Sequence, residues 1–176
     1  MRKLLFESLI RPPLTEHPPL ASSTAVDELA RALDGAAHKR LGRSLSIRAV
    51  DAGSCNGCEL EMHALNNAFY DIERFGIRFV ASPRHADVLL VTGPVTKNMR
   101  EALKRTYDAT PNPKWVVALG DCAGCFSGSY AVVRGVSEAL PVDLHIPGCP
   151  PPPIEILKGL LALLEGVNSK TGAARR

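Results

Sequence analysis

From residue 45 onward, short apolar runs alternate with longer segments in which apolar residues recur every three or four positions. The short runs are rich in β-branched residues and predict strands at residues 46–51, 77–80, 88–91, 115–119 and 142–146. The longer segments predict amphipathic helices at residues 59–75, 97–107 and 153–165. Strands that alternate with helices of this length form βαβ units. We therefore expect an α/β fold with a mostly parallel sheet and flanking helices.

Two segments flank this region. Residues 1–44 begin with a Pro-rich stretch, and because proline fixes φ and removes a backbone donor, we expect an N-terminal arm. A short amphipathic helix is predicted next, at residues 25–39. Residues 167–176 are small, polar and basic, which is typical of a flexible tail. The predicted organisation is an arm with a helix over 1–44, an α/β domain over 45–166 and a tail over 167–176.

Composition excludes several classes of function. The net charge of +3 and the aromatic content of 5% are too low to predict a nucleic-acid partner. No apolar run is long enough for a membrane span, and the N-terminal apolar run is broken by Glu7 without a cleavage site for secretion. Five cysteines are an odd number, which disfavours a disulfide framework. In a reducing cytoplasm, clustered cysteines indicate metal binding or catalysis.

All five cysteines follow predicted strands. They are Cys55 and Cys58 after the first strand, Cys122 and Cys125 after the fourth, and Cys149 after the fifth. The carboxyl ends of parallel strands share one edge of a sheet, and ligand sites of open α/β sheets lie outside that edge. The topology therefore predicts that cysteines far apart in the chain meet at one place.

Three kinds of chemistry fit this cysteine pattern. The two CxxC pairs could hold zinc, but their separation is much longer than in zinc ribbons and Cys149 is left without a role. Thiol–disulfide exchange would use only one pair. An iron–sulfur cluster also accounts for Cys149, because a cysteine followed by proline recurs among cluster ligands. The pattern favours the cluster, while zinc and exchange chemistry stay open.

Several motifs, in order, resemble the small subunit of [NiFe] hydrogenases. They are residues 51–61 (Asp-Ala-Gly-Ser-Cys-Asn-Gly-Cys-Glu-Leu-Glu), 82–87 (Ser-Pro-Arg-His-Ala-Asp), 92–96 (Thr-Gly-Pro-Val-Thr), 120–123 (Gly-Asp-Cys-Ala) and 146–151 (Ile-Pro-Gly-Cys-Pro-Pro). The resemblance is strongest to membrane-bound, energy-converting hydrogenases of the formate hydrogenlyase and hydrogenase-4 type. The same family includes the B subunit of respiratory complex I.

The resemblance implies a flavodoxin-like domain that holds one [4Fe–4S] cluster of the proximal type. The implied ligands are Cys55, Cys58, Cys122 and Cys149. Cys125 departs from the family pattern, which has a small or polar residue there, and we interpret it as a spectator thiol. The first two cysteines have the hydrogenase spacing, whereas complex I subunits have two adjacent cysteines at the first position. A complex I-like quinone oxidoreductase subunit is the first alternative, and a structural zinc protein with four cysteine ligands is the second.

The resemblance also implies the partners of the chain. Catalysis would take place in a [NiFe] hydrogenase-type large subunit, and this chain would relay single electrons between that subunit and a ferredoxin-like iron–sulfur subunit. Integral membrane subunits would hold the complex at the cytoplasmic side of the inner membrane, with this chain peripheral. Glu61 and Glu59 follow the CxxC pair and are candidates for coupling protons to electrons, with Glu61 favoured. His145 is the histidine best placed to tune the cluster.

Overall fold

The structure is a computed structural model that describes residues 23–122, 126 and 128–166. The Pro-rich part of the predicted arm, the predicted tail and Cys125 lie outside these residues. Five strands form one parallel sheet in the order β2-β1-β3-β4-β5. The strands are β1 (Ser46–Asp51), β2 (Arg78–Phe79), β3 (Val88–Thr92), β4 (Trp115–Leu119) and β5 (Leu144–Ile146). This is the flavodoxin-like strand order, which confirms the predicted fold class.

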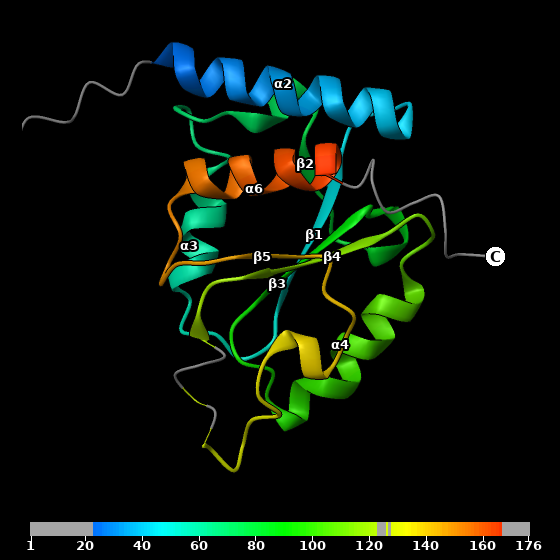
Figure 1. Cartoon of the computed structure of the whole chain (residues 1–176), viewed down its shortest axis with the longest axis vertical. Coiled ribbons are helices and arrows are strands. Elements are labelled where there is room, and N and C mark those ends of the chain that lie inside the picture. The colour runs from blue at the N-terminus through cyan, green and yellow to red at the C-terminus, as the bar shows by residue number, and fades with distance from the viewer. Residues whose placement is uncertain (1–22, 123–125, 127, 167–176) are drawn as a thin grey trace, which may run out of the picture.

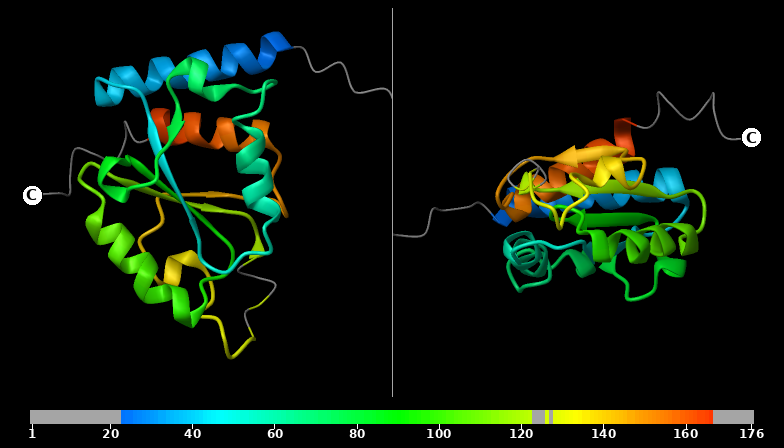
Figure 2. Two further views of the ribbon diagram at one scale, coloured as in Figure 1. Left: turned by 180° about the vertical axis from the view of Figure 1, so that it is seen from behind. Right: turned by 90° about the horizontal axis from the view of Figure 1, so that it is seen from below.

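Helices cover both faces of the sheet. The α-helices are α2 (Ser23–Leu41), α3 (Gly57–Ala64), α4 (Lys97–Ala109) and α6 (Pro153–Gly166), and the 3-10 turns are η1 (Ile72–Phe75), η2 (Pro83–His85) and η3 (Val136–Glu138). Helices α2, α3 and α6 lie on one side of the sheet and α4 lies on the other (Figures 1 and 2). The molecule is therefore a three-layer α/β/α arrangement.

The central strand β3 contributes side chains to the two hydrophobic cores, one on each face of the sheet. Val88 and Leu90 pack with residues of α2 and α6, whereas Leu89 and Val91 pack on the side of α4. All five residues of β3 are buried, as expected for a parallel strand covered on both faces. The continuous apolar run of its sequence follows from this double burial.

Helix α2 confirms the helix predicted at residues 25–39 and is slightly longer. It packs along α6, and Leu33 and Ala37 belong to the core that α6 shares with the sheet. Arg74 in η1 also pairs with Asp27 of α2 at 2.9 Å. The division of the chain at residues 45 and 166 stays a prediction.

The single helix predicted at residues 59–75 is wrong. Helix α3 ends at Ala64, and only the last four residues of the prediction form the separate turn η1. Between them, the Asn67 side-chain carbonyl accepts hydrogen bonds from the backbone N–H groups of Phe69, at 2.8 Å, and of the next residue, at 3.0 Å. Asparagine side chains compete with helical hydrogen bonds in this way. Leu60 and Phe69, two apolar residues of the segment predicted as an amphipathic helix, are 61% and 47% exposed.

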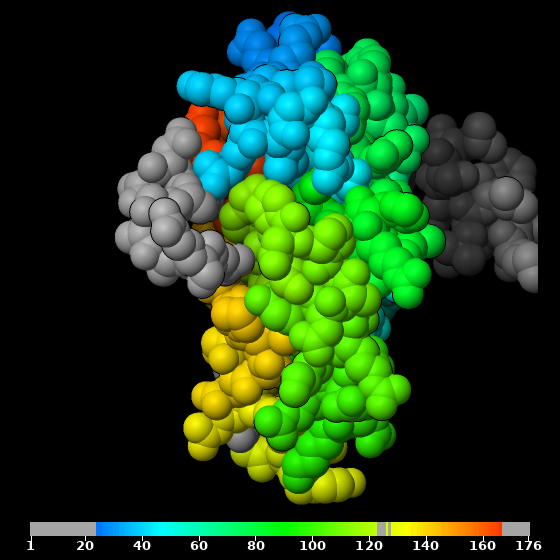
Figure 3. Space-filling view, turned by 90° about the vertical axis from the view of Figure 1, so that its right-hand side faces the viewer, coloured from blue at the N-terminus to red at the C-terminus, as the bar shows by residue number. Residues whose placement is uncertain are grey.

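The other predicted elements are confirmed with small shifts. Helix α4 begins after Thr96, whose hydroxyl accepts a hydrogen bond from the Met99 backbone N–H at 3.3 Å. Strand β5 is two residues shorter than predicted. Just before it, the Asp143 carboxylate accepts a hydrogen bond from the Val116 N–H at 2.8 Å, in place of a ladder carbonyl. In Figure 3, α2 forms the top of the visible face and α4 lies below it. No helix in the described part of the chain is long and apolar enough to cross a membrane.

Candidate metal centre

The cysteines lie where three strands of the sheet end. The Cys55–Cys58 loop follows β1, Cys122 follows β4 and Cys149 follows β5. These strands are parallel, so their carboxyl ends share one edge, in the lower left part of Figure 1. Strands β1 and β3 are neighbours in the sheet although β2 comes between them in sequence. The first cysteine loop therefore lies at the topological switch point, where ligand sites of this architecture occur.

Cys58 lies within electrostatic range of the other three described cysteines. Cys58 is 2% exposed, and the pKa of its thiol is raised from 9.0 to about 12. Burial is the largest cause of this pKa shift, followed by Cys122, Glu59, Cys55 and Cys149. Cys55, Cys122 and Cys149 thus lie near enough to Cys58 to affect its pKa, and none of these four cysteines forms a disulfide bond. That they are the ligands stays a prediction.

Glycine makes room for the sulfur atoms. Gly120 has a φ of +88°, and a Cβ atom there would lie 2.7 Å from the Cys58 Sγ atom, which is closer than real Cβ atoms approach. A Cβ atom at Gly57 would lie 3.5 Å from the Cys55 Sγ atom. The positive φ at Gly120 is a conformation that L side chains rarely adopt. The backbone at the end of β4 is therefore shaped to let the sulfur of Cys58 approach.

The loops that carry Cys122 and Cys149 are tied together by Asp121. The Asp121 carboxylate accepts a hydrogen bond from the Gly148 N–H at 2.7 Å, and the Asp121 N–H donates to the Gly148 carbonyl at 2.9 Å. His145 Nε2 lies 3.0 Å from the Gly120 carbonyl oxygen and 3.6 Å from the Asp121 carboxylate. These contacts hold the third and fourth cysteines in a set relation to each other.

Glu59 and Glu61 have different surroundings. The Glu59 carboxylate accepts hydrogen bonds from the Ser54 hydroxyl at 2.6 Å and from the Thr92 hydroxyl. Glu61 is half-buried, and its side chain makes no hydrogen bond or ion pair with the residues that the structure describes. Neither Ser54 nor Thr92 was predicted from the sequence to be a site residue. A signal was present for Thr92, because it is a polar residue at the end of a fully buried strand.

The donor set suits a thiolate-bound metal centre. In the described segments, no three His, Cys, Asp or Glu side chains meet closely enough to hold a single ion. Four thiols nevertheless share one rim, and the glycine at the end of β4 leaves space at the sulfur of Cys58. In a [4Fe–4S] cluster each of four thiolates binds a different iron, so the thiols need not meet around one point. The residues present fit that group.

Comparison with protein families shows to which family the chain belongs. The family described as the NADH ubiquinone oxidoreductase 20 Kd subunit matches residues 55–163, which is more than half of the chain. The chain belongs to this family. The matched region starts at Cys55 and extends into α6, so it includes all three cysteine-bearing loops.

Two relatives show where in the family the similarity is found. The chain is 44% identical over 146 residues to formate hydrogenlyase subunit 7 of Escherichia coli, in an alignment that covers 80% of the chain and 57% of that relative. It is 47% identical over 130 residues to a probable membrane-bound hydrogenase subunit of Pyrococcus furiosus, covering 72% of the chain and 78% of that relative. The chain thus spans little more than half of the first relative. The similarity confirms the resemblance to hydrogenase small subunits.

A solved structure has the same fold. A chain in the structure of the membrane-bound sulfane sulfur reductase, an archaeal respiratory membrane complex, superposes with a TM-score of 0.65 at 35% sequence identity. The match covers 81% of this chain and 79% of that chain. The family is described by a subunit of an oxidoreductase, and both relatives are named as subunits of larger enzymes.

Proposed function

We propose that this chain is the electron-transfer subunit of a membrane-associated [NiFe] hydrogenase-type complex and holds one [4Fe–4S] cluster of the proximal type. Cys55, Cys58, Cys122 and Cys149 are the proposed ligands. The observation that carries the proposal is the convergence of three cysteine loops. The Cys58 Sγ atom lies 3.9 Å from the Leu119 carbonyl oxygen at the end of β4, and a Cβ atom at Gly57 would lie 3.8 Å from Pro150, which follows Cys149. The names of the two relatives support the hydrogenase branch.

The chain's own residues position the cluster and set its surroundings. A bound cluster supplies a one-electron redox centre. The polypeptide sets its potential through hydrogen bonds, charge and burial. Glu59 adds negative charge beside Cys58, as its effect on the pKa of that thiol indicates, and this charge favours the oxidised form of the centre. Glu61 and His145 remain candidates for proton coupling and tuning.

The proposed partners follow from the relatives. A large subunit of the [NiFe] hydrogenase type would carry out catalysis, a ferredoxin-like subunit would carry further iron–sulfur clusters, and integral membrane subunits would anchor the complex. The chain would lie peripherally on the cytoplasmic side of the inner membrane. The relative from Pyrococcus furiosus is named as a membrane-bound hydrogenase subunit, and the structural neighbour belongs to a respiratory membrane complex.

The cofactor is tested by metal analysis of the full-length chain, purified anaerobically and apart from any other iron-containing subunit. We expect about four irons per chain, a matching amount of acid-labile sulfide and a paramagnetic signal after reduction. Stoichiometric zinc without iron would support the structural zinc alternative and contradict the proposal. Because the four thiolates are needed as ligands, loss of any one of them is expected to lower the iron content.

The ligand set is tested by two matched serine variants. Cys122→Ser is expected to lose most of the iron, because the thiolate it removes is a proposed ligand. Cys125→Ser is expected to keep the iron, because we interpret this residue as a spectator. Iron content and the absorbance spectrum are the measurements. The reverse pattern would make Cys125 the third ligand.

A complex I-like quinone oxidoreductase is the second candidate, because the family takes its description from that enzyme. The two candidates differ in the large subunit that co-purifies with the chain. Paired CxxC motifs in that subunit would supply the thiolate ligands of a nickel–iron site and support the hydrogenase. Their absence would support the quinone oxidoreductase.

A further inference from the structure

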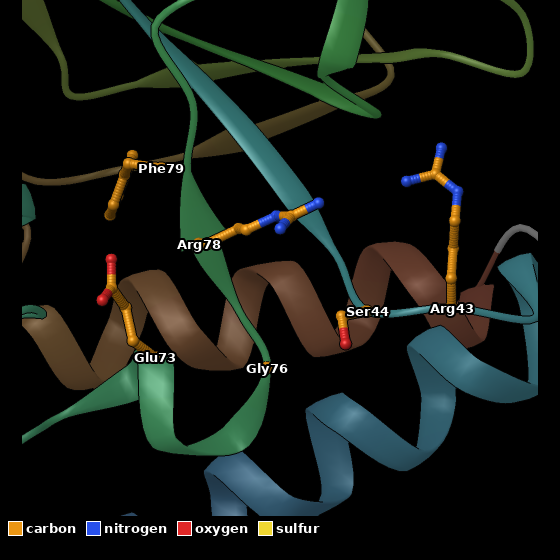
Figure 4. Close-up of a pocket in the computed structure, with 6 residues that line it drawn as sticks. All are labelled: Arg43, Ser44, Glu73, Gly76, Arg78 and Phe79. Atoms are coloured by element: carbon orange, nitrogen blue, oxygen red, sulfur yellow. The ribbon is translucent and has the colours of Figure 1, made fainter.

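A hollow lies at the edge of the sheet opposite to the cysteines. Its volume is about 450 Å³, within the range of small-molecule pockets. It lies where β1 and β2 begin, whereas the cysteines follow the ends of strands. The residues that line it are Arg43, Ser44, Glu73, Gly76, Arg78 and Phe79 (Figure 4). The pocket is thus separate from the proposed cluster site.

Arg43 is held in place by a buried carboxylate. Asp87 is 1% exposed, and its two oxygens accept hydrogen bonds from the Arg43 guanidinium, one of them at 3.1 Å. Asp87 also accepts a hydrogen bond from the Ser46 N–H at 3.0 Å, which fixes the carboxylate to the start of β1. The Arg43 side chain nevertheless remains 53% exposed. Its guanidinium is therefore oriented before any ligand arrives, and Asp87 balances its charge.

Arg78 supplies a positive charge that no carboxylate of the described residues balances. Its Nε atom donates a hydrogen bond to the hydroxyl of Ser46 at 3.3 Å, and Ser46 is completely buried. Within the described ranges, no carboxylate forms an ion pair with Arg78. In Figure 4 the Arg78 side chain extends toward the side of Arg43, away from Glu73 and Phe79. The pocket therefore has a cationic end and a separate end with the carboxylate and the aromatic ring.

Gly76 allows Ser44 to lie close to the backbone in the wall of the pocket. Its φ is +76°, and a Cβ atom there would lie 2.6 Å from the Ser44 hydroxyl oxygen and 3.1 Å from the Asp34 Oδ1 atom. A side chain at this position would displace Ser44 from the wall. The glycine thus allows the Ser44 hydroxyl, a further hydrogen-bond donor, to line the same hollow as the two guanidinium groups.

We propose that this pocket binds an oxyanion of the phosphate class, through the guanidinium groups of Arg78 and Arg43 and the hydroxyl of Ser44. Guanidinium forks match the oxygens of phosphate, and charge-assisted hydrogen bonds of this kind are stronger than neutral ones. The oxyanion is either a soluble phosphate compound or the headgroup of an anionic phospholipid. The site takes no part in electron transfer and does not depend on the cluster.

The test compares Arg78→Gln with Arg100→Gln in the full-length chain. Arg100 is exposed on α4, so its variant changes the net charge equally without touching the pocket. Inorganic phosphate is titrated calorimetrically at constant ionic strength, with chloride as the reference anion. Co-sedimentation is measured with phosphatidylcholine vesicles that contain or lack phosphatidylglycerol.

We expect Arg78→Gln to weaken binding by about 10-fold or more, and Arg100→Gln to bind as the unaltered chain does. Arg78→Lys keeps the charge without the fork and is expected to fall between them, which provides a second variant if Arg78→Gln does not fold. An Arg78-dependent affinity for inorganic phosphate supports a soluble ligand, and Arg78-dependent binding only to vesicles with phosphatidylglycerol supports the lipid. Absence of binding to both, or equal losses in the Arg78 and Arg100 variants, overturns the proposal.

Discussion

At the scale of single residues, the backbone at Gly120 leaves no room for a side chain beside the Cys58 sulfur. The residue combines a positive φ with a predicted Cβ position 2.7 Å from the Cys58 sulfur. Either feature alone disfavours a side chain, and together they leave no relaxed position for one. The carbonyl of the same residue also lies 3.0 Å from His145 Nε2. A change here affects both the sulfur and the contact with β5.

Gly120→Ala is therefore expected to lower the free energy of unfolding by about 1–3 kcal/mol and to reduce the iron content. Urea unfolding and iron analysis are the measurements. Gly35→Ala is the matched control, because Gly35 lies within α2 with open space around its Cβ position. That change is expected to raise the free energy of unfolding by about 0.5–1 kcal/mol. Unchanged iron and stability in Gly120→Ala would contradict the steric argument.

At the scale of elements, the start of α4 is connected to the first cysteine loop. The Thr96 N–H donates a hydrogen bond to the Ala52 carbonyl at 2.9 Å, and the Ala52 N–H donates to the Thr92 carbonyl at 3.1 Å. The helix cap thus lies beside the segment that leads from β1 to the CxxC pair. The order of the loop depends on this helix end as well as on its own residues.

Thr96→Ala removes the hydroxyl that caps α4 and is expected to lower the free energy of unfolding by about 1 kcal/mol. Thr96→Ser keeps the hydroxyl and should restore most of the loss. Thr106→Ala provides a control in the same helix, since its hydroxyl bonds only to the Ala102 carbonyl one turn earlier. We expect that control to change stability by less than about 0.5 kcal/mol. Equal effects of Thr96→Ala and Thr106→Ala in urea unfolding would exclude a capping role.

At the scale of the whole molecule, the fold buries the Cys58 thiol near the other cysteines, and the stability of the folded chain therefore depends on pH. The pKa of Cys58 is about 12 in the folded chain, against an ordinary value of 9.0. Without a metal, the unfolded chain releases this proton near pH 9, whereas the folded chain keeps it to about pH 12. The folded state holds more protons in this window. Its stability is therefore complete below about pH 9 and falls as the pH rises toward about 12.

For the cluster-free chain, the free energy of unfolding is expected to fall with rising pH more steeply in the unaltered protein than in Cys58→Ala. Urea unfolding at a series of pH values from about 8 to about 10 measures this difference. Cys55→Ala is the control, because Cys55 is exposed and its loss leaves Cys58 buried. Parallel pH profiles for the unaltered chain and Cys58→Ala would refute the expected linkage. Metal ligation needs the thiolate, so assembly should release a proton and be favoured at higher pH.

The strands and helices that depend on neighbouring residues could be predicted from the amino-acid sequence alone. Strands β1 and β4 have the predicted bounds, because each is a short segment with β-branched residues that is too short for an amphipathic helix. Helix α6 begins at its predicted proline, since proline at a first helical position loses no hydrogen bond. The alternation of strands and helices also determined that the strands are parallel. From this topology alone, the cysteine loops were expected at one edge of the sheet.

The features that depend on contacts between residues distant in the chain could be seen only in the tertiary structure. Helix α3 ends at Ala64 although an apolar spacing continues, because the Asn67 side chain takes over backbone hydrogen bonds. The contrast between Glu59 and Glu61 depends on Thr92, which only the pairing of β1 with β3 places beside Glu59. The cationic pocket likewise requires Asp87, just before β3, to meet Arg43, just before the neighbouring strand β1. Local propensity acts over a few residues, whereas such contacts form only when the sheet has assembled.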